Sequence, residues 1–422
     1  QDLYSIAKKY YEALLADPGN AQFHLTDPRG ASDKSGRTFN NPYQYFFEQM
    51  HMDDAIYADE SIYEYPMQQG GGNDGRPYSF GRPSSGGSKA AYPCKSYGQG
   101  RINPAYFYGV FDPNDMRRDV SITMTGSNGK GVEKLIPFVP NSKAEGGGLT
   151  LNKWDENRQA NPWVAAQRKS GINGPYMRMS EVYLGYAEVC AALGDVVTGK
   201  QYLKTVRERS FPQGLANTDA FIASFGNDLV RAIIEERGFE YAGEGDRRWT
   251  LIRSGYLPED IKRIKDMTKA MMDGLATKGY YEFENGNIIS AYIWTKLVDA
   301  KTIYGHRLTA QCPTDKVNDP VLYPGWRGQK DNWEEMGLNY GSSTPATNLA
   351  IKGLFEIVSE EEAASLESQG YAKVNWGIDL VDYRDEYDKY LFWDYDYVSA
   401  PIYLWPFTPN AVSYTHLTLP TN

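Results

Sequence analysis

Histidine and cysteine, the residues that most often build metal and nucleophilic sites, are scarce in this sequence. It has four histidines and three cysteines among 422 residues. Cys94, Cys190 and Cys312 lie far apart with no C-x-x-C spacing, which excludes a zinc site of the familiar spacings. The sequence also has no G-x-S-x-G, no H-E-x-x-H and no phosphate-binding P-loop. We therefore expect no catalytic residue, no metal and no cofactor.

Positive charge is also in deficit, because the formal net charge is −10 and the pI is about 5.1. This balance argues against binding to nucleic acid, whose phosphates need a surface rich in Lys and Arg, and against docking on an anionic membrane leaflet. No apolar run approaches the ~18 residues of a membrane-spanning helix. The chain starts at Gln1 without an initiator methionine or an apolar export signal, so we expect an N-terminal part to be missing.

Aromatic residues are abundant: there are 33 Tyr, 16 Phe and 9 Trp. At 41% apolar and 23% charged residues, the composition is that of a globular protein with a substantial core. Some of the rings fill this core. So many phenols and indoles usually leave rings at the surface as well, where amphipathic rings are suited to recognition. Composition alone leaves both roles open.

Helical periodicity is strongest near the start of the chain and in its middle, over residues 1–25 and 176–255. The first part predicts one amphipathic helix, with Leu3, Ile6, Ala7, Tyr10 and Leu14 in its apolar stripe. The second predicts helices from Tyr176 to a stop at Gly194, over 200–210, after a cap at Asp228, and from Asp246. Together they indicate a mainly α fold.

The remaining segments, 26–175 and 256–411, are predicted to be loop-rich. They contain shorter elements, namely helices over 43–52, 260–272 and 360–368 and a strand over 60–65. No linker marks a boundary, so residues 1–411 are expected to form a single domain. Residues 412–422 show no helical period or turn logic, and we expect this tail to lie outside the fold.

Three ordered motifs in the helical block carry a resemblance to a known family. Residues 178–188 are similar to the "R-x-x-E-x-x-L-x-x-A-E" helix of SusD/RagB proteins, and residues 206–209 to their "N-x-V-R-x-R". Residues 234–249 resemble the "I-x-x-E-R-x-x-E-x-x-x-E-G-x-R" block. Weaker matches are the helix over 3–16, the strand over 60–65, Asp115-Met116-Arg117, and Tyr403-Leu404-Trp405-Pro406.

This resemblance implies a superhelix of tetratricopeptide-like helical hairpins packed beside a loop-rich, irregular ligand-binding face. It also implies a lipoprotein exposed at the cell surface of the outer membrane, with its signal and lipidated cysteine upstream of this fragment. The partner would be a SusC-like TonB-dependent barrel that imports oligosaccharides. The resemblance thus implies a glycan-binding protein for carbohydrate uptake, and not an enzyme.

Charged residues recur throughout the matched motifs, and paired carboxylates could also run glycoside hydrolysis. Their helical spacings, such as i, i+3 for Arg178 and Glu181 and i, i+4 for Glu236 and Glu240, are instead typical of ion pairs that hold helices together. We predict a structural ion-pair set of Arg178, Glu181, Glu188, Arg207, Arg209, Glu236, Arg237, Glu240, Glu244 and Arg247.

Two neighbourhoods combine aromatic rings with polar side chains, as sugar recognition requires. A flat ring covers the apolar C–H face of a pyranose, while amide, carboxylate and guanidinium groups meet its hydroxyls. The candidate ligand-binding residues are Tyr78, Phe80, Arg82, Tyr92, Tyr97, Trp326, Asn332, Trp333 and Tyr340. The sequence does not separate a glycan from a peptide ligand, because clefts rich in Tyr and Trp serve both. A peptide-capturing RagB-like protein and a glycoside hydrolase remain the alternatives.

Overall fold

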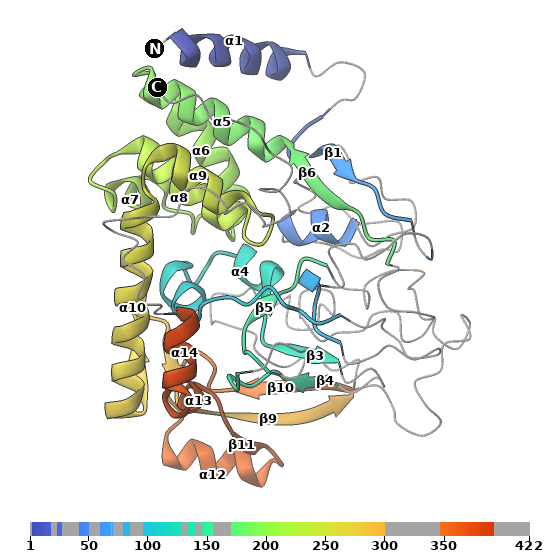
Figure 1. Ribbon diagram of the computed structural model, residues 1–422, viewed down its shortest axis with the longest axis vertical. Coiled ribbons are helices and arrows are strands. Elements are labelled where there is room, and N and C mark those ends of the chain that lie inside the picture. The colour runs from blue at the N-terminus through green and yellow to red at the C-terminus, as the bar shows by residue number, and fades with distance from the viewer. Residues whose placement is uncertain are drawn as a thin grey trace, which may run out of the picture.

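The structure is a computed structural model in which a helical part packs beside a part made of loops and small sheets (Figure 1). It describes residues 2–17, 23–27, 42–49, 60–68, 70, 79–84, 96–127, 133–140, 146–154, 170–299 and 347–391. The expected mainly α fold is confirmed. No helix among the described residues is long and apolar enough to cross a membrane.

Helices α5 (Met179–Ala192) and α6 (Val196–Arg209) form a hairpin. Gly194 lies in its turn with φ of +87°, a left-handed conformation that favours glycine and ends α5 as predicted. Helix α6 begins four residues before the predicted start, because the Asp195 carboxylate caps it by accepting a hydrogen bond from the Thr198 amide at 3.2 Å. The predicted start of α5 is also corrected: Tyr176 lies in a strand, and the helix begins at Met179.

The next helices cover the open side of this hairpin. The Asp228 carboxylate accepts a hydrogen bond from the Arg231 amide at 2.9 Å, which confirms the predicted cap of α8. A core of Leu184, Leu203, Val206 and Ile233 joins α5, α6 and α8. The helices are α7 (Thr218–Ala223), α8 (Leu229–Glu240), α9 (Asp246–Ser254) and the long α10 (Leu257–Lys278).

Helix α1 (Asp2–Ala16) forms as predicted and lies against α5 at the top of Figure 1. It does not dock through its main apolar stripe, because Leu3, Ile6 and Tyr10 are exposed. The face that meets α5 instead carries Tyr11, whose ring centroid lies 6.4 Å from that of Tyr186. The same face carries Lys8, whose Nζ lies 3.1 Å from a carboxylate oxygen of Asp195.

Short antiparallel strands organise the loop-rich part. Strand β9 (Tyr292–Asp299) lies between β10 (Thr347–Lys352) and β11 (Ala372–Asn375). Four two-stranded ribbons accompany it: β1 (Ser61–Tyr65) with β6 (Gly174–Arg178), β2 (Ile122–Thr123) with β5 (Thr150–Leu151), β3 (Thr125–Ser127) with β4 (Glu133–Leu135), and β7 (Tyr280–Glu282) with β8 (Ile288–Ser290).

The helices between these strands are short. Helix α12 matches the prediction for 360–368, and the Ser359 hydroxyl caps it. The short helices of this part are α2 (Pro42–Gln49), the π-helix η3 (Tyr106–Val110), α4 (Arg117–Ser121), α12 (Glu360–Ser368), α13 (Gly377–Asp382) and α14 (Arg384–Leu391).

A large apolar core holds this part together and reaches α10. Trp376 lies at its centre: the indole Nε1 donates a hydrogen bond to the Tyr108 hydroxyl at 2.8 Å, and its ring centroid lies 4.2 Å from that of Phe138. Met271 and Met272 of α10 pack into the same core. Residues from the first and last thirds of the described chain therefore share one interior.

Candidate functional site

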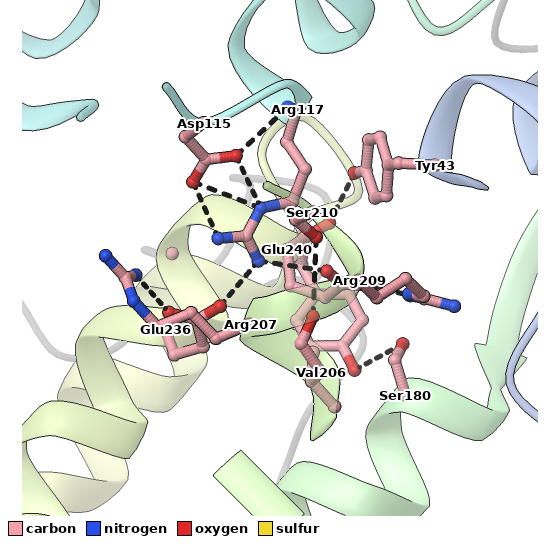
Figure 2. Close-up of polar contacts among 12 residues, drawn as sticks. Tyr43, Asp115, Arg117, Ser180, Val206, Arg207, Arg209, Ser210, Glu236 and Glu240 are labelled. Atoms are coloured by element: carbon pink, nitrogen blue, oxygen red, sulfur yellow. Dashed lines mark hydrogen bonds and ion pairs between the residues drawn. The ribbon is translucent and has the colours of Figure 1, made fainter. Parts of the chain in front are cut away.

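The Glu240 carboxylate, at the end of α8, is the centre of a buried ion-pair network (Figure 2). It accepts hydrogen bonds from three guanidinium groups: Arg209 Nη2 at 2.7 Å, Arg117 Nη1 at 3.1 Å, and Arg178 Nη1. The backbone carbonyl of Glu240 also accepts a hydrogen bond from the Tyr43 hydroxyl, at 2.5 Å. Helices α2, α4, α6 and α8 and strand β6 thus meet at one residue. We call Glu240, Arg117, Arg178 and Arg209 the Glu240 cluster.

Strand β6 and the residue before β1 are tied to this cluster. Arg209 Nη1 lies 2.6 Å from one carboxylate oxygen of Glu60. Arg178 Nη1 lies 3.1 Å from the other. The Glu244 carboxylate accepts hydrogen bonds from Arg178 Nη2 at 3.0 Å and from Lys153 Nζ at 2.7 Å. Arg178 therefore joins three carboxylates, and its guanidinium fixes strand β6 against the end of α8.

A second row of pairs runs from the same helix toward α4 and α6. The two carboxylate oxygens of Glu236 lie 2.7 Å from Arg117 Nη1 and 2.8 Å from Arg207 Nη1. Arg117 also forms a two-pronged pair with Asp115, at 2.6 Å from Nη2 and 2.9 Å from Nε. The Arg207 guanidinium carbon lies 3.8 Å from the ring centroid of Phe221.

The remaining motif residues pair between helices in the same way. Arg237 Nη2 lies 2.7 Å from Glu181 and 2.5 Å from Asp246. Arg247 Nη2 lies 2.9 Å from Glu235. Glu188 pairs with Arg253, whose Nη2 lies 2.8 Å from a carboxylate oxygen of Glu188. Each of the ten residues singled out from the sequence thus takes part in an ion pair. Arg178 and Glu181 do not pair with each other, because Arg178 lies in strand β6 and Glu181 pairs with Arg237 of α8.

The charges set the protonation of the network. Burial alone would raise the pKa of the Glu240 carboxyl, but Arg178, Arg209 and Arg117 together hold this pKa well below its ordinary value. At Glu244 burial likewise favours a higher pKa, but Arg178 and Lys153 lower the pKa below its ordinary value. For Lys153 burial dominates and lowers the pKa to about 8. Both carboxylates are therefore ionised at neutral pH and already hydrogen-bonded.

This geometry does not suit acid–base catalysis. A glycosidase needs one carboxylic acid with a raised pKa beside a second carboxylate, both reaching the substrate. Glu240 has the opposite pKa shift, and its side chain is fully buried. Among the described residues, no group of His, Cys, Asp or Glu is arranged to hold a metal ion. Cys190 is a free, buried thiol.

The sequence-predicted ligand residues fall in very different places. Phe80 is 46% exposed and Tyr97 is half-buried, so both can reach a surface ligand. Arg82 is 3% exposed and pairs with Glu133 of β4, while its Nη2 also donates to the Thr125 hydroxyl of β3 at 3.0 Å. In this structure its guanidinium holds the β3–β4 hairpin, and its expected ligand contact stays a prediction. Outside the described residues lie Tyr78, Tyr92, Trp326, Asn332, Trp333 and Tyr340.

Sequence reasoning missed the most exposed aromatic cluster among the described residues. Tyr63 and Tyr65 of β1 and Tyr176 and Met177 of β6 are all exposed on one two-stranded ribbon. We call these four side chains the aromatic ribbon. The signal was present as the alternation of Tyr63 and Tyr65 in a predicted strand, which places both on one face. The pairing with Tyr176 could not be read from the sequence.

A separate cleft of about 780 Å³ opens between α7, α8, α10 and β7. Phe221, Phe239 and Phe283 line it, with Arg207 and Asp115 of the ion-pair network at its wall. These rings are partly or fully buried, and the lining combines apolar residues such as Met267 with charged ones such as Glu235 and Arg263.

The fold and the buried network define a class of protein in which helical hairpins are held in register by ion pairs beside a loop-rich face. Comparison with known proteins then names the family. The model of the SusD family matches residues 22–414, and the chain belongs to this family.

Individual relatives are more distant. A curated SusD-like protein P25 from Formosa agariphila is 28% identical over 160 residues, which cover 38% of this chain and 26% of that protein. A solved SusD homolog from Bacteroides thetaiotaomicron is 19% identical, with 63% of this chain and 51% of that chain covered and a TM-score of 0.42. The surface glycan-binding protein A from the same organism, solved with laminarihexaose, is 19% identical, covers 61% and 51%, and has a TM-score of 0.41. The chain thus matches about a quarter of the curated relative and about half of the solved ones.

Proposed function

We propose that this protein captures oligosaccharides at a bacterial cell surface and passes them to a SusC-like TonB-dependent barrel of the outer membrane. In this role it is a lipid-anchored binding protein and not an enzyme. The observation that carries the proposal is the distribution of side chains in a member of the SusD family. The motif carboxylates are taken up in buried ion pairs, whereas phenol rings are exposed on β1 and β6.

Exposed tyrosines suit a glycan for two reasons. The ring face covers the apolar C–H face of a pyranose, and the phenol hydroxyl can donate to or accept from sugar hydroxyls. A binding protein that hands its ligand to a transporter also needs only moderate affinity, because it must release what it captures. We expect dissociation constants between micromolar and millimolar, or roughly −8 to −4 kcal/mol.

Affinity electrophoresis of the 422-residue chain tests this function. Native gels would contain laminarin, amylopectin, xylan or mannan, with a glycan-free gel and a non-binding protein as references. Laminarin is included because a solved relative was bound to laminarihexaose. We expect at least one polysaccharide to retard the protein, and overnight incubation with that polysaccharide to yield no product on chromatography.

Three outcomes separate the competing functions. Retardation without product supports glycan capture. Reproducible cleavage of the polysaccharide overturns the non-enzymatic assignment in favour of a glycoside hydrolase. Absence of retardation in every gel, together with calorimetric binding of a tryptic peptide mixture, overturns glycan capture in favour of a peptide-capturing protein.

A further inference from the structure

The ribbon of β1 and β6 has a buried end and an exposed stretch. Ser61 and Arg178 pair in register at one end, where both are buried and Arg178 joins the Glu240 cluster. Beyond this pair the exposed fractions are 59% for Tyr63, 56% for Tyr65 and 70% for Tyr176. The rings of Tyr63 and Tyr176 meet edge to face, with centroids 5.7 Å apart and planes at 86°. These rings are exposed although the strands that carry them are anchored.

Both ends of the ribbon are fixed by contacts that do not use its three tyrosine rings. At one end the Glu60 carboxylate, next to β1, pairs with Arg178 and Arg209. At the other end the Asn173 side chain accepts a hydrogen bond from the Met67 amide at 2.8 Å and donates one to Glu64 at 2.9 Å. The rings therefore sit on a preorganised backbone, so a ligand that binds them does not have to order the strands first.

The chemistry of the exposed side chains on the ribbon indicates what it binds. It carries three phenols and a thioether, and none of these four side chains bears a formal charge at neutral pH. No hydroxyl of the three tyrosines makes a hydrogen bond to any residue in the part of the chain that the structure describes. A neutral ligand with apolar faces and a fringe of hydroxyls satisfies both the rings and these free hydroxyls. A phosphate, a nucleic acid or a strongly charged peptide finds no partner here.

The exposed apolar stripe on α1 differs from the aromatic ribbon in its chemistry. Leu3 and Ile6 are aliphatic and have no polar group to offer, so that stripe suits another apolar surface. The aromatic ribbon instead extends roughly 7 Å along a strand and about 4.8 Å across to the next strand. Its rings thus form a narrow strip that offers hydroxyls as well as apolar ring faces.

We propose that the aromatic ribbon is a stacking surface for a neutral oligosaccharide. Tyr63 and Tyr176 would form its centre and Tyr65 its extension toward the segment that follows β1. This inference rests on the proposed glycan capture and assigns it a location, separate from the loop residues singled out in the sequence.

Paired variants in the same affinity gels test the location. Tyr63→Ala with Tyr176→Ala removes both central rings, and we expect the dissociation constant for the retarding polysaccharide to rise at least about tenfold. Tyr63→Phe with Tyr176→Phe keeps the rings, and we expect a rise of no more than about threefold, since stacking is retained. Trp249→Ala is the matched control, because this ring is 51% exposed on α9, away from the ribbon, and should bind as the wild type does.

The outcomes distinguish this inference from the function on which it depends. If the wild type is retarded and the double alanine variant is retarded equally, the ribbon is not the site, while glycan capture stands. If no gel retards the wild type, both fall. Circular dichroism checks that the variants fold, and Tyr65→Ala replaces the double variant if that one unfolds. A change of oligomeric state on size exclusion, with unchanged gel mobility, would instead identify the ribbon as a protein interface.

Discussion

The buried end and the exposed stretch of the β1–β6 ribbon show two different uses of polar side chains. At the buried end, Arg178 meets Glu60, Glu240 and Glu244, so its donors are taken up within the fold. In the exposed stretch, the hydroxyls of Tyr63 and Tyr176 make no hydrogen bond to another described residue. Groups that are fully satisfied inside the protein can only fix its shape, whereas groups left unsatisfied at a rigid surface can recognise a ligand. The two parts of the ribbon therefore predict opposite outcomes for mutation: lost stability at one and lost binding at the other.

The largest effect is expected at the centre of the Glu240 cluster. Glu240→Ala leaves the guanidinium groups of Arg117, Arg178 and Arg209 buried without their shared carboxylate. Breaking a buried ion pair by removing one partner costs about 3–5 kcal/mol. We expect a loss of this size in the free energy of unfolding from urea titration. Lys204→Ala, which removes a pair that is about half exposed, is the control and should change little.

Arg237→Ala tests an ion pair next to the Glu240 cluster. Arg237 is buried, whereas its partners Glu181 and Asp246 are partly exposed, so water can reach the stranded carboxylates. We expect a loss of about 2–3 kcal/mol in the free energy of unfolding, smaller than at Glu240. A variant that keeps its melting temperature yet loses glycan binding would contradict the structural role of the motif and remove the contrast between buried ion pairs and exposed rings.

The pH dependence of stability sharpens the comparison without removing any side chain. Because the folded-state pKa of Glu240 lies below the ordinary 4.5, its ion pairs stabilise the fold fully above that pH. This stabilisation is lost as the pH falls below 4.5, and Glu244 adds a loss of the same sign. We expect the melting temperature to fall steeply below pH 4.5, and Glu240→Gln to flatten that slope. An equal slope in wild type and variant would show that other groups control acid unfolding.

Much of the helical part could be predicted from the sequence because its signals are local. Gly194 ends α5 and Asp228 caps α8, and each acts within a few residues of its own position. The charged motif residues were also recognisable, since their spacing along helices is regular. Their partners were not, because an ion pair such as that of Glu188 with Arg253 joins residues on different helices.

The features that were missed depend on tertiary contacts. The apolar stripe of α1 was visible in the sequence, but not that the helix would dock through Lys8 and Tyr11 instead. Arg82 lies among glycines and aromatic residues in the sequence, which is typical of a ligand-binding loop. Only the folded β3–β4 hairpin shows that Glu133 lies beside it. The aromatic ribbon needed the register that aligns Tyr63 with Met177, which no local pattern encodes.

The smallest effect on stability is expected where rings lie in the loop-rich segments, and these variants decide how binding is shared with the ribbon. Trp326, Trp333 and Tyr78 lie outside the described residues and remain ligand candidates from the sequence alone. Loops contribute less to global stability than packed hairpins do, so alanine at each position should leave thermal unfolding nearly unchanged. We expect at least one of the three to weaken binding about tenfold, or ~1.4 kcal/mol, by calorimetry.

Combining that loop variant with Tyr63→Ala and Tyr176→Ala then separates two arrangements. If loop and ribbon contact the same sugar chain at distant points, their losses in binding free energy should add within about 0.5 kcal/mol. If both contact one sugar ring, the losses should fall short of the sum, because the second substitution removes a contact that the first has already weakened. Wild-type binding by all three loop variants would shift the search to the ribbon and to the remaining candidates Phe80 and Tyr97, which the structure places at or near the surface.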